Sequence, residues 1–142
     1  MLISLSNLNR IKAHAKETFP EECCGLLIGN FEEENGIRRN IVRYVAPCVN
    51  RLRGDRTQGF EIAAYQRYDI EMAAKEYGMN IVGTYHSHTL FGAFPSASDC
   101  DATPALQTML IVAVNMGVIE EVRAFCKNID RDIAEEQIQF LF

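Results

Sequence analysis

Several hallmarks of other protein classes are missing from this sequence. It contains no Trp, and its five Cys, at positions 23, 24, 48, 100 and 126, include no Cys-x-x-Cys pair. An odd, unpatterned set of thiols argues against a disulfide framework or a structural zinc ribbon. No segment approaches the ~20 consecutive apolar residues that span a bilayer. Residues 1–12 show neither the basic start nor the apolar stretch of a signal peptide. We therefore expect a cytoplasmic protein that does not bind membranes.

Positive charge is also scarce. The chain has 14 Lys and Arg against 19 Asp and Glu, a net charge of −5, and its main basic segment is the short "RLRGDR" at 51–56. So small a basic segment is typical of a solvated loop, and we expect no nucleic-acid partner. At 142 residues and 48% hydrophobic content the chain can bury one core. We expect a single domain over 1–142.

The hydrophobic pattern predicts strands alternating with helices. Asn35-Gly36 between two apolar runs predicts a hairpin, because both residues tolerate positive φ. Helical crossovers and hairpins together indicate an α/β or α+β layered domain, with a mixed central β-sheet flanked by helices. Strands are expected at 2–5, 23–31, 37–48, 79–88, 108–116, 119–128 and 138–142, and helices at 6–19, at 61–78 and from 96, with room for a last helix near 130–137.

Two of the three His, His86 and His88, stand at the end of a predicted strand. Residues i and i+2 of a strand point to the same face, so both imidazoles can address one point. Neutral imidazoles are natural zinc ligands. A His-x-His pattern alone does not require a metal. The alternative is that both His are exposed, or that one is buried and hydrogen-bonded to the backbone.

Asp99 strengthens the metal interpretation. It follows His86 by thirteen positions, at a predicted helix start, and the intervening loop can fold back to present its carboxylate. Two His, one Asp and a water form the open tetrahedral zinc site of hydrolytic enzymes. Alone, Asp99 is equally a favourable charge at a helix N-terminus. Asp101 is the competing candidate ligand.

A hydrolytic site also needs a base for its water, and an oxyanion donor. Glu21 and Glu22 lie between Pro20 and a predicted buried strand, an unusual place for two acids, although a solvated turn explains them as well. Ser96 can donate its hydroxyl to an oxyanion or cap the helix that follows. Composition leaves these alternatives open.

Together these residues resemble the JAMM/MPN+ (Mov34/MPN/PAD-1) family of zinc metalloproteases. Its motif is a distant Glu, then His-x-His, seven residues, Ser, two residues and Asp, which stands here as "HSHTLFGAFPSASD". The family's Glu lies three residues before a strand-opening Gly, which selects Glu22. The similarity extends over essentially the whole chain, including "PEECCGLLIG", Asn50, Phe60, "GMNIVGTYHSH" and "VRAF".

The resemblance implies an MPN/cytidine-deaminase-like fold and a set of roles. His86, His88 and Asp99 would ligate Zn²⁺, Glu22 would be the general acid/base, and Ser96 would stabilise the oxyanion. The family cleaves peptide or isopeptide bonds after the C-terminal Gly-Gly of ubiquitin or ubiquitin-like proteins. We expect the tail of such a partner to lie along a sheet edge beside the site, in a groove lined by 48–60 and 89–95.

One departure narrows the expectation. Most members have Pro directly after His-x-His, whereas this chain has Thr89. Thr89, the compact length and "FPS" are similar to the bacterial CysO-cysteine peptidase type, which releases cysteine from a sulfur-carrier protein. This subfamily is the expected substrate class. The alternatives are a non-catalytic MPN scaffold, which usually lacks part of the ligand set, and a general small-peptide metallopeptidase.

Overall fold

One mixed eight-stranded sheet organises the molecule. The computed structural model describes residues 1–142, and the sheet order is β7-β6-β5-β4-β2-β3-β1-β8. Strands β1/β3, β1/β8 and β4/β5 pair parallel and the other neighbours antiparallel. The strands are β1 (Leu2–Ser4), β2 (Cys24–Glu34), β3 (Ile37–Cys48), β4 (Asn80–His88), β5 (Thr108–Asn115), β6 (Val118–Lys127), β7 (Ile133–Glu136) and β8 (Gln139–Leu141).

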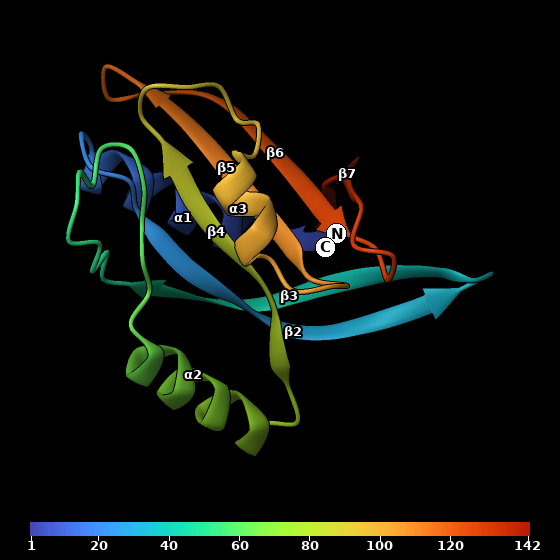
Figure 1. The fold of residues 1–142 in the computed structure, drawn as a ribbon. Coiled ribbons are helices and arrows are strands. Elements are labelled where there is room, and N and C mark those ends of the chain that lie inside the picture. Colours follow the sequence, from blue (N-terminus) through green and yellow to red (C-terminus); the bar gives the residue numbers. More distant parts are fainter.

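Helices cover both faces of this sheet (Figure 1). They are α1 (Leu5–Thr18), α2 (Ala64–Glu76) and α3 (Ala97–Ala102). Successive residues of a strand point to opposite faces, so β2 separates two cores. Leu27 packs with the buried stripe of α1, whereas Leu26 packs with Ile70 of α2. The predicted mixed sheet flanked by helices is confirmed.

Local signals place several elements as expected. Asn35 and Gly36 have φ of 54° and 77° and form the turn between β2 and β3, because both residues tolerate the left-handed region. The cap of α1 is Ser4, whose side chain accepts from Asn7 N–H, and the helix begins at Leu5, one residue before the expected start at 6. None of the helices is of the length and apolarity needed to cross a membrane.

One expectation about a helix is wrong. Residues 130–137 contain no helix, because Ile133–Glu136 pairs antiparallel with β6 as an edge strand and the neighbouring strand supplies its backbone hydrogen bonds. On the second expected helix, Tyr65 and Tyr68 face solvent and are 63% and 61% exposed. The other face of α2 packs on the sheet through Ile70 and the buried Ala74.

Candidate metal centre

His86 and His88 lie in the middle of the sheet, at the C-terminal end of β4. Cys24 of β2 and Ile111 of β5 pair with His86 on either side, and His86 is completely buried. The ring of Phe60 stacks on that imidazole, with centroids 4.6 Å apart and planes at 28°. Strand pairing and stacking together leave the imidazole one orientation.

Three donor atoms converge at this point. The two Nε2 atoms of His86 and His88 lie 3.1 Å apart, and each lies 3.2 Å from Oδ2 of Asp99. In a regular tetrahedron the distance from centre to vertex is the edge divided by about 1.63, so these edges place a central ion about 1.9–2.0 Å from each atom. Zinc–nitrogen bonds of ~2.0–2.1 Å match this size.

The protonation of His88 also indicates that a cation fits between the three donor atoms. Nδ1 of His88 lies 2.8 Å from the carbonyl oxygen of Gly92, so it carries a hydrogen and a neutral ring has its lone pair at Nε2. That lone pair faces the Asp99 oxygen, and two acceptors at 3.2 Å repel unless a positive charge lies between them. Burial lowers the pKa of His88, but hydrogen bonds with Asp99 and Gly92 outweigh burial and raise it. The site therefore favours positive charge.

Asp99 is positioned by the start of α3. Ser96 is the N-cap: its Oγ accepts from Asp99 N–H at 3.1 Å, and its own N–H donates to Oδ2 of Asp99 at 2.9 Å. Burial raises the pKa of Asp99, but the interactions with the His86 and His88 rings outweigh burial and hold this pKa well below the usual range. Asp99 is therefore a carboxylate, and the exposed Asp101 makes none of these contacts.

The cap does not use up the Ser96 hydroxyl. Its oxygen accepts the Asp99 N–H, while its hydrogen has no acceptor in the structure. Capping and donation to a substrate oxygen are thus compatible, and the two alternatives from the sequence do not exclude each other.

Glu22 lies across from His88. Cys24 pairs with His86 in the antiparallel β2/β4 ladder, and the same register carried two residues further brings Glu22 opposite His88. Glu22 is 2% exposed, and burial raises its pKa to about 8. Glu21, by contrast, points outward and pairs with Arg56 at 2.8 Å.

Glu22 is also close enough to be considered as a ligand. Its carboxylate and the nitrogens of His86 and His88 all lie within 4.8 Å of one another. The shorter distances of Asp99 favour Asp99 as the third ligand and leave Glu22 as the candidate general base beside the site. The structure thus brings together all five residues named from the sequence: Glu22, His86, His88, Ser96 and Asp99.

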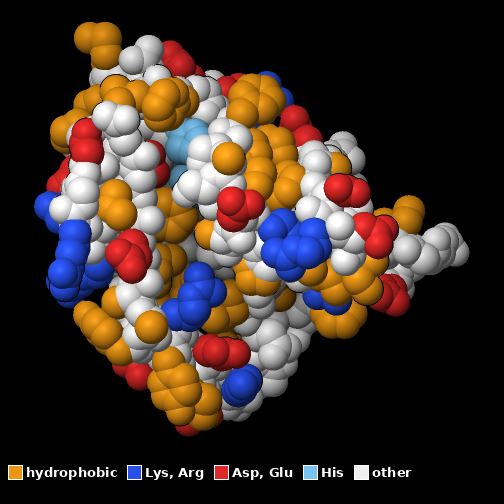
Figure 2. Space-filling model, viewed as in Figure 1, with side chains coloured by type: hydrophobic (Ala, Val, Ile, Leu, Met, Phe, Trp, Pro, Cys, Tyr) orange, Lys and Arg blue, Asp and Glu red, His pale blue; other side chains and the backbone are white.

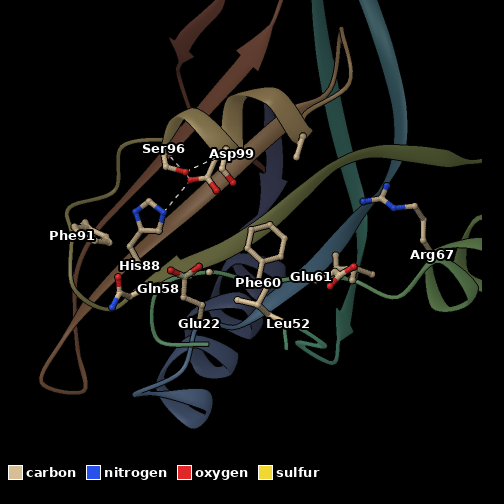
Figure 3. Close-up of a pocket in the computed structure, with 14 residues that line it drawn as sticks. Glu22, Leu52, Gln58, Phe60, Glu61, Arg67, His88, Phe91, Ser96 and Asp99 are labelled. Atoms are coloured by element: carbon tan, nitrogen blue, oxygen red, sulfur yellow. Dashed lines mark hydrogen bonds and ion pairs between the residues drawn. The ribbon is translucent and has the colours of Figure 1, made fainter. Parts of the chain in front are cut away.

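These groups open into a groove with a volume of about 620 Å³. Figure 3 shows Glu22 below and Ser96 and Asp99 above the His88 imidazole, with Arg67 at the far end, and in Figure 2 His side chains remain visible in a hollow of the surface. As expected, both loops line the groove, through Leu52 and 58–60 and through Phe91. The sheet-edge expectation is wrong: β7 and β8 are the edges, and β4 has a neighbour on each side.

Asn50 has a structural role that the sequence does not reveal. Its Nδ2 donates to the carbonyl oxygens of Glu22 and Gly59, each at 3.0 Å. Its Oδ1 accepts from the N–H groups of Leu52 and Glu61 at 3.1 and 3.2 Å. One amide thus ties the general-base candidate to the loop that forms the groove, a role that no local pattern signals.

Ser87 and Thr89 hold the surrounding chain. Ser87, buried between the two His, accepts from Cys23 N–H at 2.8 Å and fixes the backbone next to Glu22. Thr89 donates its hydroxyl to the Thr57 carbonyl at 2.9 Å and so joins the two loops of the groove. The JAMM/MPN+ family that the sequence resembles usually has proline at this position, and proline has no hydroxyl to make this bond.

Comparison with known proteins agrees with this geometry. Residues 4–126 match the family described as prokaryotic homologs of the JAB domain. A solved protein from Salinibacter ruber is 34% identical, with a TM-score of 0.73 over 99% of this chain and 92% of its own. A protein from Desulfitobacterium hafniense has a TM-score of 0.79 at 23% identity, with the same coverage. The structure of a JAB1/MPN domain protein from Archaeoglobus fulgidus is similar over the full length of both chains, with a TM-score of 0.61 and 19% identity. No curated protein sequence matches the chain.

Proposed function

This chain belongs to the family of prokaryotic homologs of the JAB domain, and on that premise we propose that it is a zinc-dependent metallopeptidase. Its substrate is the bond after the C-terminal Gly-Gly of a ubiquitin-like or sulfur-carrier protein, with cysteine as a leaving group. The observation that carries the proposal is the 3.1–3.2 Å triangle of His86, His88 and Asp99, with the buried Glu22 beside it.

The residues of the site divide the reaction between them. His86, His88 and Asp99 would hold the Zn²⁺, which would supply Lewis acidity toward the scissile carbonyl and the attacking water. Glu22 takes the proton of the attacking water and delivers it to the leaving amine. Burial raises the pKa of Glu22, and a bound cation would favour the ionised form that accepts this proton. Ser96 donates its free hydroxyl hydrogen to the developing oxyanion.

The groove suits an extended tail better than a folded surface. The irregular segment 58–62 lines it, and it runs from the metal site to Arg67. The Arg67 guanidinium has no ion-pair partner within 4 Å, so its charge is free to meet an acidic group of a substrate. A tail ending in two Gly can approach the reacting atoms closely because it has no side chains there.

The test begins with metal analysis of the purified protein and hydrolysis of Gly-Gly-terminated carrier proteins bearing Cys, Lys or a longer peptide. We expect one zinc per chain, cleavage at the Gly-Gly terminus, and loss of hydrolysis in Glu22→Gln with zinc retained. Glu21→Gln is the matched control, because Glu21 is the adjacent acid but pairs outside the groove with Arg56.

Each contrary result points to another function. Cleavage by Glu22→Gln at the wild-type rate excludes the mechanism. Equal cleavage of unrelated short peptides favours a general peptidase, and a chain without zinc and without hydrolysis is a binding scaffold.

A further inference from the structure

A single peptide unit links the metal site to β6, which lies two strands away from β4, on the same face of the sheet. The carbonyl oxygen of Gly92 accepts from Nδ1–H of His88 at 2.8 Å. The N–H of the next residue, Ala93, donates to Oε1 of Glu121, also at 2.8 Å. Both groups belong to the Gly92–Ala93 peptide bond, so His88 and Glu121 are joined through one planar amide.

Glu121 is held in the orientation that this contact requires. It lies on β6, and its second oxygen, Oε2, accepts from Nε of Arg123 at 3.1 Å. Arg123 in turn contacts both oxygens of Glu135 on β7 at 3.1 and 3.2 Å, and its guanidinium lies 4.6 Å from the ring centroid of Phe94. The two oxygens of Glu121 thus have separate partners, and its carboxylate cannot turn without losing one.

The loop fits closely against this carboxylate. A Cβ placed on Gly92 would lie 3.1 Å from Oε1 of Glu121, which is tighter than an ordinary contact. Ala93 is completely buried against Ile111 and Phe125 on the same face of the sheet. The peptide unit is therefore fixed from both sides, by its packing and by its hydrogen bonds.

We propose that Glu121 is a positioning residue for the metal centre, acting on His88 through the Gly92–Ala93 peptide. A carboxylate that accepts from an amide N–H polarises the amide, and its carbonyl oxygen becomes a stronger acceptor. The stronger acceptor holds the proton of His88 on Nδ1, aims Nε2 at the metal and makes that nitrogen a better ligand. The inference rests on the proposed metal site and not on the proposed peptidase activity.

The test compares Glu121→Ala and Glu121→Gln with Glu135→Gln. The Glu135 variant is the matched control, since it removes a carboxylate from the same Arg123 but leaves the contact with Ala93. Zinc affinity is measured by competition with a chromophoric chelator. We expect a 10–100-fold loss for Glu121→Ala. Glu121→Gln should lose less, because its amide oxygen can still accept from Ala93, and Glu135→Gln should keep the wild-type affinity.

A second measurement does not need the metal. In zinc-free protein, the Nδ1–H proton of His88 is observed by ¹H–¹⁵N NMR, and we expect its resonance to move upfield in Glu121→Ala because its hydrogen bond weakens. An unchanged resonance, zinc affinities within about twofold of each other, or an equal loss in Glu135→Gln would overturn the inference. A wild-type protein that binds no zinc would refute the proposed function, whereas the His88 resonance would still decide the role of Glu121.

Discussion

Replacement of Glu22 by Gln should stabilise the metal-free protein, and the gain should grow with pH. Burial raises the pKa of this carboxyl from an ordinary value of 4.5 to about 8. Between these values the unfolded chain releases the proton and the folded chain keeps it. The free energy of unfolding therefore falls as pH rises through this window and becomes level above it. Gln does not ionise, so the free energy of unfolding of the variant does not fall with pH for this reason.

The size of the effect follows from the window. Each pH unit between 4.5 and about 8 changes the free energy of unfolding by about 1.4 kcal/mol. The whole window corresponds to about 4 to 5 kcal/mol in favour of the variant, a large fraction of the ~5–15 kcal/mol that stabilises a typical domain. Because Glu22 is 2% exposed, solvent screening reduces this value little.

The assay is urea unfolding of wild type, Glu22→Gln and Glu21→Gln from pH 4 to pH 9 in the presence of a chelator. The difference between Glu22→Gln and wild type should be smallest at pH 4 and increase up to about pH 8, while Glu21→Gln shows no such trend. A difference that stays constant with pH would refute the reasoning, because it would mean that Glu22 ionises normally in the folded protein.

Three further predictions concern the centre and the groove. Asp99→Asn should weaken zinc binding by more than about 100-fold, because loss of a residue that only orients a ligand already costs about 10–100-fold. Chelator competition measures this affinity, and an equal loss in Asp101→Asn would contradict the ligand assignment. Ser96→Ala should lower kcat by about 10²–10³ with zinc content unchanged, and a change in KM alone in steady-state kinetics would argue for ground-state binding instead. Thr89→Val should lower the free energy of unfolding by about 0.5–1.5 kcal/mol, because the bond to Thr57 is lost; Thr89→Ser should restore it in denaturant titrations, and no rescue would mean that packing, not the hydroxyl, matters.

Features of the fold that depend on a few neighbouring residues could be predicted. The positive φ that Asn35-Gly36 tolerates predicted the hairpin, and the cap at Ser96 was among those expected for the third helix. The segment 130–137 was not predictable in this way. Its polar residues are compatible with a helix, and only the free edge of β6 makes Ile133–Glu136 a strand. The exposed Tyr65 and Tyr68 of α2 show the same limit, since helical spacing does not say which side of a helix meets the sheet.

For the candidate site, the sequence by itself determined the donor types and their local geometry. His86 and His88 share a face because residues i and i+2 of any strand do, and Asp99 follows from the helix cap at Ser96. The family resemblance already selected Glu22, but only the tertiary structure shows how distant acids reach the site. The β2/β4 register brings Glu22 across from His88, and β6 brings Glu121 to the Gly92–Ala93 peptide. Backbone geometry sets local spacing, whereas these contacts depend on strand pairing and burial across the whole sheet.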